Sequence, residues 1–366
     1  MTESSMDPEL KAFGPTPLGV TPNFEHPASK KPMVIGLLVA IMPFTLLTFG
    51  LRVYGKAFVR KSFNASDWSC VAGAISLAGW TYVLLHMCAV PGMGNHQYEL
   101  RLKDVPDIYF ASLIAGGILF AVCQYFVKIS LLLLITELFW PRKWIRYILF
   151  AATGATTLMY LIYVILSMFY CIPRSGETVI EASTGRCLTI LPLSSVLGAF
   201  NVVSDIFILG ISIPILMGLN TSLQRRLRAS ALFCLGLIAT ALSIASAYFR
   251  IKNDTTDGTW DYPTIVITGY YETSLGLICA CVPTLPILGQ SATGQRILNS
   301  RLFSLLTSKD TTQSRSKGSL PGGGFMRHQN NSSTTGLASQ GIRVDTEFGI
   351  ANTYELQEEQ RKYGVR

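Results

Sequence analysis

Residues 109–139 form the stretch that most limits the fold of this chain, because they are almost wholly apolar and carry Lys128 in their interior. About 20 such residues cross the roughly 30 Å of a bilayer's hydrocarbon core as a helix. A cation at that depth costs about 2.5–3.5 kcal/mol, so it normally faces the interior of a helix bundle and pairs with an acid. The alternative is that Lys128 extends along the helix until its amine reaches the interface. The first interpretation requires further helices around this one.

Six further apolar blocks occur in the sequence, and only 14 % of all residues are charged, against about 25 % in soluble domains. The seven blocks are residues 33–51, 69–90, 109–139, 146–170, 193–219, 229–251 and 263–289. This pattern predicts an all-α polytopic membrane protein in which residues 33–289 form a seven-transmembrane-helix bundle within the lipid bilayer.

Basic residues gather after the first, third and fifth blocks, and the positive-inside rule places such segments in the cytoplasm. The segment after the first block carries Arg52, Lys56, Arg60 and Lys61. The other two are predicted cytoplasmic basic loops with Arg142, Lys143, Arg225, Arg226 and Arg228. We therefore expect a plasma-membrane protein with an extracellular polar tail, residues 1–32, and a cytoplasmic C-terminus. The net charge of +8 then reflects topology, and no nucleic-acid partner is expected.

The C-terminal part of the chain changes character after the seventh block. Residues 290–308 place Leu298, Leu302, Leu305 and Leu306 on one helical face, which indicates an amphipathic helix on the membrane surface or the frayed start of the tail. Residues 309–366 are rich in polar residues and poor in apolar ones, so they are predicted to be a disordered cytoplasmic tail.

Polar residues near the middle of three blocks are the candidate core site. At about 1.5 Å per residue, Lys128, Asp205 and Glu272 fall within roughly 12 Å of one another in height. Lys128 is expected to pair with one of the two acids, which would reduce its desolvation cost. Asn201 lies four residues before Asp205 and shares its helical face. Two roles stay open for this group: a polar switch or ion site, and a static clamp on helix register.

Three features belong to the predicted extracellular side. Cys171 and Cys187 flank a polar loop in an oxidising compartment, which favours a disulfide over two free thiols. Gly92, Gly94 and His96 form an outer-loop motif in which a loop role is favoured over metal binding, since no second ligand stands at a suitable spacing. Asn253 begins the one glycosylation sequon on this side.

Motifs of enzymes are missing from the sequence. It contains no G-x-S-x-G, H-E-x-x-H or P-loop pattern, so no enzymatic activity is predicted. The seventh block contains no lysine to carry a retinal Schiff base, so we expect no retinal and no other cofactor.

Several short motifs, in their order and spacing, resemble the fungal rhodopsin-domain integral membrane proteins, the group that includes the Pth-type receptor-like proteins. The carriers are Asp67 and Trp68, the Gly92–His96 motif, Lys128 with Ser130, Cys171 with Cys187, Asn201 with Asp205, Arg250, and Glu272 with Cys279 and Cys281. The resemblance covers about residues 33–290 and implies a seven-helix, receptor-like membrane protein without retinal.

Two hypotheses for function follow. In the first, an extracellular ligand of unknown identity shifts the bundle, and the basic loops and tail contact a cytoplasmic signalling protein. In the second, the protein is a seven-helix transporter or channel that uses the intramembrane charges Lys128, Asp205 and Glu272.

Overall fold

The computed structural model of the protein describes residues 12–17, 19–138, 143–217, 223–252 and 257–284. All of them belong to one compact unit, Met1–Ser308. The predicted amphipathic helix 290–308 and disordered tail 309–366 lie outside the described residues, as do Arg142 and Asn253.

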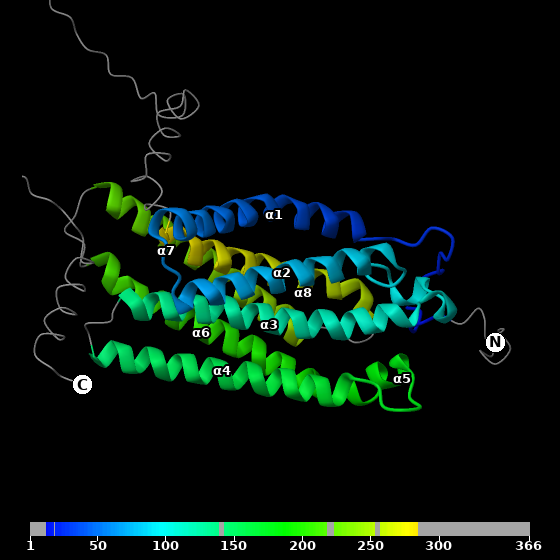
Figure 1. Cartoon of the computed structure of the whole chain (residues 1–366). Helices are drawn as coiled ribbons and strands as arrows, with labels where there is room; N and C mark the ends of the chain where they lie inside the picture. Colours follow the sequence, from blue (N-terminus) through cyan, green and yellow to red (C-terminus); the bar gives the residue numbers. More distant parts are fainter. Residues whose placement is uncertain (1–11, 18, 139–142, 218–222, 253–256, 285–366) are drawn as a thin grey trace, which may run out of the picture. The chain divides into compact units, whose positions relative to one another are not determined.

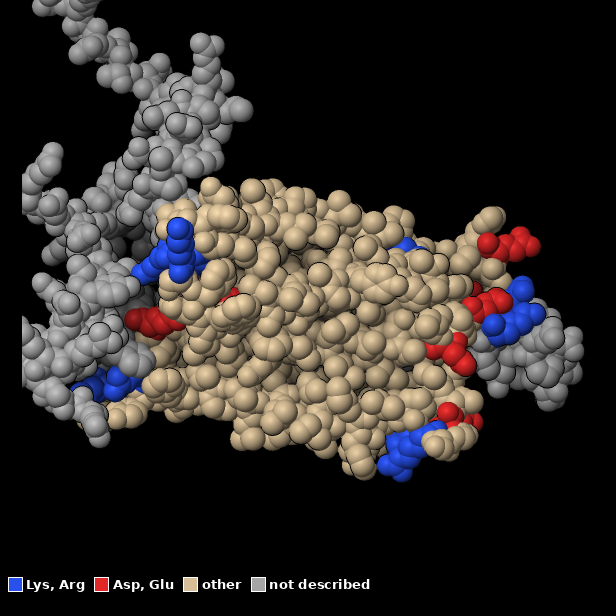
Figure 2. Space-filling view, in the orientation of Figure 1, with Lys and Arg blue, Asp and Glu red and all other residues tan. Residues whose placement is uncertain are grey.

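Seven helices within the described residues are long and apolar enough to cross a membrane, which confirms the predicted fold class (Figure 1). They are α1 (Lys31–Tyr54), α2 (Ala65–Ala89), α3 (Asp107–Leu138), α4 (Lys143–Cys171), α6 (Leu191–Met217), α7 (Leu223–Lys252) and α8 (Gly258–Cys281). The short helix α5 (Val179–Thr184) lies in the connection between α4 and α6. In Figure 2 a wide belt nearly free of charged residues separates the two ends of the bundle, as expected for a segment in contact with lipid.

Helices α3 and α8 form the interior of the bundle. Within their most apolar windows, 56 % of α3 and 67 % of α8 is buried, against at most 39 % for the other spans. Helix α3 packs against α2, α4 and α8, while α8 also contacts α1 and α7. Helices α1 and α4 lie on opposite sides of this interior in Figure 1. The prediction that the stretch with Lys128 is surrounded by other helices is therefore confirmed.

Small residues allow the interior helices to approach closely. A Cβ atom on Gly73 of α2 would lie 3.3 Å from Val127 of α3, and one on Gly276 of α8 would lie 2.8 Å from the same side chain. Lipid tails are as apolar as leucine, so association of membrane helices depends on such close packing. Val127 is thus held between α2 and α8.

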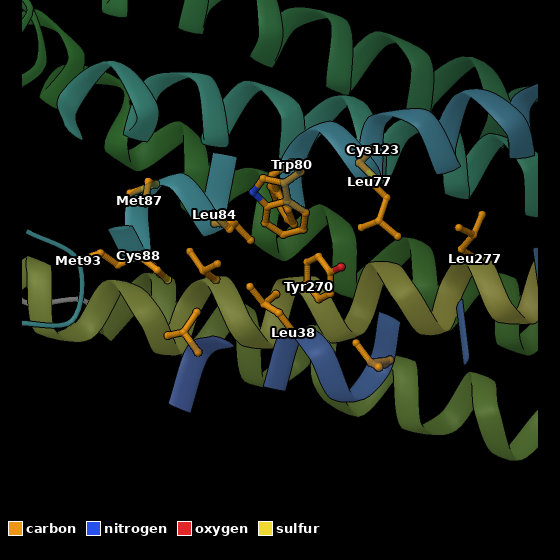
Figure 3. Close-up of a cluster of buried hydrophobic side chains, with 14 of the residues drawn as sticks. Leu38, Leu77, Trp80, Leu84, Met87, Cys88, Met93, Cys123, Tyr270 and Leu277 are labelled. Atoms are coloured by element: carbon orange, nitrogen blue, oxygen red, sulfur yellow. The ribbon is translucent and has the colours of Figure 1, made fainter. Parts of the chain in front are cut away.

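Aromatic side chains fill the adjoining part of the core (Figure 3). The ring of Trp80 lies 5.1 Å from that of Phe120 and 5.5 Å from that of Tyr270. The hydroxyls of Tyr270 and Thr81 share a hydrogen bond of 2.8 Å, so this buried phenol has a polar partner. These contacts join α2, α3 and α8 independently of the charged residues.

The first helix is longer than the first apolar block. Arg52 lies in α1, and Lys56 lies in the π-helical turn Gly55–Arg60 that follows without a break. Both side chains are buried, so the expectation that they are loop charges is wrong. The helix continues because Asp67 of α2 supplies a buried carboxylate with which both cations form ion pairs.

One of the predicted basic loops is helical where it is described, and Lys143 of the other begins a helix. Helix α7 begins at Leu223, so Arg225, Arg226 and Arg228 lie in its first turns, and Lys143 is the first residue of α4. Gln, Arg and Leu have high helix propensity, and a helix that leaves the bilayer keeps its backbone hydrogen bonds. The basic residues therefore mark the end of an apolar block but not the end of its helix.

The Gly92–His96 motif ties together the starts of α1 and α8. The backbone N–H of Lys30 donates to the carbonyl of Gly94 (2.9 Å), and the N–H of Gly94 donates to the carbonyl of Thr259 (2.9 Å). Nδ1 of His96 lies 2.6 Å from Oδ2 of Asp257, and the ring of His96 stacks on that of Trp260 at 3.8 Å. The motif thus serves as a structural junction in the loop. No group of metal-ligating side chains was found among the described residues.

Gly92 permits this junction because its φ of +131° is one that residues with a side chain rarely adopt. A Cβ atom there would lie 2.8 Å from the ring of Tyr109. We predict that Gly92→Ala destabilises the protein by about 1–3 kcal/mol through backbone strain and this clash. Thermal unfolding of the purified protein in detergent measures the effect.

The matched control for that measurement is Gly36→Ala, because Gly36 lies in α1 and a Cβ atom there would meet nothing within 4 Å. We expect Gly36→Ala to unfold at the wild-type temperature or slightly above it. Equal midpoints for the two alanine variants would contradict the role assigned to the Gly92 turn.

Candidate functional site

Lys128 of α3 forms an ion pair with Asp205 of α6. The side chain of Lys128 is 3 % exposed and that of Asp205 is 17 % exposed, so the pair lies inside the bundle. The ammonium group also donates to the backbone carbonyl of Asn201 at 3.3 Å. Of the two acids considered from sequence, the structure places Asp205 against the lysine. Its amine is directed into the bundle and does not extend to the interface.

Asn201 connects a third helix, α4, to this pair. It lies one turn before Asp205 on α6, and its side-chain oxygen accepts a hydrogen bond from the buried hydroxyl of Tyr160 in α4. The turn of α6 from Asn201 to Asp205 therefore presents a carbonyl and a carboxylate to Lys128 and an amide to Tyr160. This connects α3, α4 and α6 through polar contacts.

Glu272 of α8 lies against the same face of α3 as the lysine. Its Oε1 accepts a hydrogen bond of 2.6 Å from Nε2 of Gln124, which precedes Lys128 by one turn of α3. Its Oε2 is buried and has no hydrogen-bond partner among the described residues. A buried polar atom without a partner carries a desolvation cost of about 1–3 kcal/mol, more for a charged group. This oxygen is therefore a place where a proton, a cation or a hydrogen-bond donor would bind favourably.

We call Gln124, Lys128, Tyr160, Asn201, Asp205 and Glu272 the core network. Arg250 of α7 adjoins it, with its guanidinium 4.5 Å from the ring centre of Phe120 and within electrostatic range of Glu272. Glycines make the space for Arg250, since a Cβ on Gly198 would lie 3.3 Å from its Cδ. With Arg250 included, two cations face two acids, so the formal charges balance.

Gln124 and Tyr160 were not recognised in the sequence. Gln124 stands in an apolar stretch four residues before Lys128. This i, i+4 spacing places both side chains on one helical face and could have identified Gln124 as part of the site. Tyr160 carries no such signal, because a tyrosine in a membrane helix is common at many depths. Its role depends on the packing of α4 against α6.

A second buried cluster lies near the opposite end of the bundle from the Gly92–His96 motif. Asp67 Oδ1 accepts hydrogen bonds from Nη2 and Nε of Arg52 at 2.7 and 3.1 Å. Asp67 Oδ2 lies 2.8 Å from Nζ of Lys56. Nη1 of Arg52 donates to the carbonyl of Ala280, which connects α1 and α2 to the end of α8. The sequence does not predict this cluster, because both cations follow an apolar block and so indicate a loop.

Cys171, the last residue of α4, and Cys187 form a disulfide with a Cα–Cα distance of 4.5 Å. It encloses α5, which begins with a capping box in which Thr178 and Glu181 bind each other's backbone N–H groups. We call this end of the bundle the disulfide end. The side chain of Arg186 hydrogen-bonds to Glu177 and holds the pKa of that carboxyl below its usual value. The contribution of this pair to stability is therefore present near neutral pH and is lost as pH falls through the lowered pKa.

These features define a class: an integral membrane protein with seven spanning helices and a polar network in its core. Comparison with known proteins identifies the family, because the fungal rhodopsin domain matches residues 51–290. The chain belongs to the fungal rhodopsin-domain family, which confirms the resemblance found in the sequence.

Named relatives have been found in several fungi. The chain is 24 % identical to "Fugralins biosynthesis cluster protein 2" of Gibberella zeae over 77 % of this chain and 71 % of the relative. It is 29 % identical to "SAT4 family membrane protein" of Emericella nidulans over 61 % of this chain and 58 % of the relative. It is 26 % identical to "Satratoxin biosynthesis SC1 cluster protein 4" of Stachybotrys chartarum over 48 % and 65 %. No solved structure is significantly similar.

The ion pair in the core network leads to a prediction about stability. We expect Lys128→Met to destabilise the bundle by about 2–4 kcal/mol, because it leaves the mostly buried carboxylate of Asp205 without its cation. Adding Asp205→Asn should restore part of this loss, since the stranded charge is then removed. Thermal unfolding in detergent or nanodiscs measures the three proteins.

The control is the double variant Lys128→Met with Glu272→Gln, which removes an acid of the same network that does not contact the lysine. We expect no comparable recovery from it. Equal recovery with both acids would mean that the lysine is not specifically paired with Asp205.

Proposed function

We propose that this protein is a receptor-like membrane protein whose core network exchanges between two arrangements. The observation that carries the proposal is the position of Glu272 beside the Lys128–Asp205 pair, with one carboxylate oxygen bound to Gln124 and the other without a partner. A ligand or surface cue at the disulfide end would favour one arrangement. The opposite end would then present a changed surface to a cytoplasmic partner.

The core network supports such an exchange because Lys128 stands between two acids on different helices. Its present partner, Asp205, is on α6. The second acid, Glu272, is on α8 and accepts a hydrogen bond from Gln124, which lies one turn from the lysine on α3. Moving the lysine from one acid to the other keeps the number of ion pairs constant, so the two states can differ by only a few kcal/mol. A small differential binding energy then suffices to shift the populations.

The names of the relatives support a small molecule as the cue. Two of the reported proteins are named for biosynthesis clusters, of fugralins and of satratoxin. We propose that this chain responds to a small metabolite rather than to a protein ligand. The proposal gives the chain no enzymatic role and no cofactor.

A distance measurement tests this function. Spin labels at Lys61, beyond α1, and Lys143, at the start of α4, report on the end opposite the disulfide; both residues are exposed. Cys234 is replaced by serine because it is an exposed free thiol. We expect some fractions of an extract of the expressing cells to change the distance distribution in nanodiscs. We expect Glu272→Gln to abolish the response and the exposed control Glu137→Gln to retain it.

A transporter is the second candidate, and Glu272 is also the observation that favours it. Acids buried within membrane helices often belong to proton relays or ion pathways. Proteoliposomes loaded with a pH-sensitive dye, and separately with the active extract fraction, distinguish the two functions. Proton or metabolite flux by the purified protein alone would contradict the receptor proposal and favour transport.

The orientation in the membrane is part of the proposal. We place the disulfide end outside the cell, which puts the Ser/Thr-rich residues 309–366 in the cytoplasm. Glycosyl transfer occurs only on the lumenal side, so the sequons report on sidedness. In this orientation Asn253 faces the lumen, whereas Asn64, Asn220, Asn330 and Asn331 face the cytoplasm.

Mapping of glycans on protein from the native host tests this orientation. A glycan on Asn253 alone supports the orientation, although its position one residue after α7 can leave it unmodified. A more decisive version of the experiment adds a sequon to the N-terminal segment before Lys31, where we expect glycosylation. A glycan on Asn330 or Asn331 would overturn the orientation and, with it, the cytoplasmic contact that a receptor requires.

A further inference from the structure

Glu272 is held through only one of its two carboxyl oxygens. The residue is 4 % exposed, Oε1 accepts the hydrogen bond of 2.6 Å from Gln124, and Oε2 has no partner among the described residues. An ionised carboxylate accepts hydrogen bonds at both oxygens, whereas a protonated one has a carbonyl oxygen and a hydroxyl. An unpaired hydroxyl in a buried site costs less free energy than an unpaired charge. The contacts of Glu272 therefore fit the neutral acid, with Oε1 as the carbonyl oxygen and the proton on Oε2.

Neither cation of the core network contacts this carboxyl. Among the described residues no ion pair includes Glu272, and Lys128 has its partner on α6. The guanidinium of Arg250 lies 4.5 Å from the ring centre of Phe120, and its Nε is engaged with Ser246 at 3.5 Å. The formal charges of the core network balance in number, but an ionised Glu272 would be buried without a counterion in contact with it.

Four charged or titratable groups on neighbouring helices act on Glu272. They are Lys128 of α3, Asp205 of α6, Arg250 of α7 and the phenol of Tyr160 on α4. The charged residues of α1 and α2 are held elsewhere, since Arg52 pairs with Asp67 and Lys31 donates to the carbonyl of Val90. Asp205 is a like charge, and two neighbouring acids rarely ionise together.

A proton suits Oε2 better than a metal ion does. Hard metal ions take several oxygen ligands at once. No group of three or more His, Cys, Asp or Glu side chains that could hold a metal ion lies among the described residues. A proton needs no second ligand and no cavity. It is therefore the occupant that fits the observed packing around this oxygen.

We propose that Glu272 is a proton-binding site and carries a proton on Oε2 at neutral pH in the arrangement observed. This deepens the exchange proposed above and rests on it for one consequence. When Lys128 moves to Glu272, the O–H bond at Oε2 breaks and the resulting carboxylate pairs with the ammonium group. The proton passes to Asp205, which the lysine has left, so the core network keeps its net charge. Glutamine has the shape of the neutral acid but no proton to release, which is why Glu272→Gln blocks the exchange.

Infrared spectroscopy of the full-length protein in nanodiscs at neutral pH tests the proton site without any ligand. A neutral carboxyl group has a C=O stretching band that a carboxylate lacks. We expect the wild-type protein to show this band, and we expect ¹³C-labelled glutamate to move it to lower frequency. Glu272→Gln should lose the band.

The matched control is Glu137→Gln. Glu137 is exposed and accepts hydrogen bonds of 3.0 Å at both oxygens, from Ser66 and Asn64, so it is expected to be ionised. Its variant should keep the band. A wild-type protein without the glutamate band, or a band that persists undiminished in Glu272→Gln, would overturn the proposal.

A second variant, Gln124→Met, keeps the proposal testable even where Glu272→Gln does not fold. It removes the donor to Oε1, so the C=O stretching band should move to higher frequency as the carbonyl loses its hydrogen bond. An unshifted band would contradict the assignment of the carbonyl to Oε1 and of the proton to Oε2.

The consequence for the exchange is measured by adding the active extract fraction. The glutamate band should fall, and an aspartate band that labelled glutamate does not shift should rise. A distance change between Lys61 and Lys143 without this loss would overturn the proton coupling and leave the receptor proposal standing. A glutamate band with no distance change in any fraction would support the proton site and contradict the receptor proposal.

Discussion

The fold depends on how a lysine is accommodated at membrane depth. Lys128 stands in one of the two interior helices of the bundle, where a solitary ammonium group would be unstable. The ammonium group pairs with Asp205 and donates a hydrogen bond to the carbonyl of Asn201, and both partners lie on one turn of α6. Tyr160 then fixes that turn to α4, and Gln124 fixes Glu272 of α8 to the same face of α3. A single charge thereby determines how four helices face one another.

The two ends of the bundle are stabilised differently. At the disulfide end, the Cys171–Cys187 bridge and the His96–Asp257 contact hold short loops against the starts of helices. At the other end, Arg52 spans from Asp67 of α2 to a backbone carbonyl of α8. A change in the core network therefore has a direct route to that end along α8. This is the physical basis of the receptor-like function that we propose.

The class of fold was predictable because it depends on long apolar blocks, which require no knowledge of packing. The depth of Lys128, Asp205 and Glu272 was also predictable, since it depends only on rise per residue. The choice of Asp205 over Glu272 as the partner of Lys128 was not predictable. The depth of a residue in the membrane does not determine how α6 and α8 are rotated about their axes. Arg52 and Lys56 were assigned to a loop because their partner, Asp67, lies in another helix. A basic residue at the end of an apolar block signals a helix end or a buried pair equally well.

The distance between the lysine ammonium and the aspartate carboxylate tests the central claim most directly. Solid-state NMR on protein in bilayers, with ¹⁵N-labelled lysine and ¹³C-labelled aspartate, measures it through dipolar dephasing. The account predicts strong dephasing of one lysine signal, assigned by its loss in Lys128→Met, from a nitrogen–oxygen contact within about 4 Å. Asp205→Asn should remove the dephasing, while Glu272→Gln should leave it. A Lys128 signal without dephasing in the wild-type protein would contradict the account.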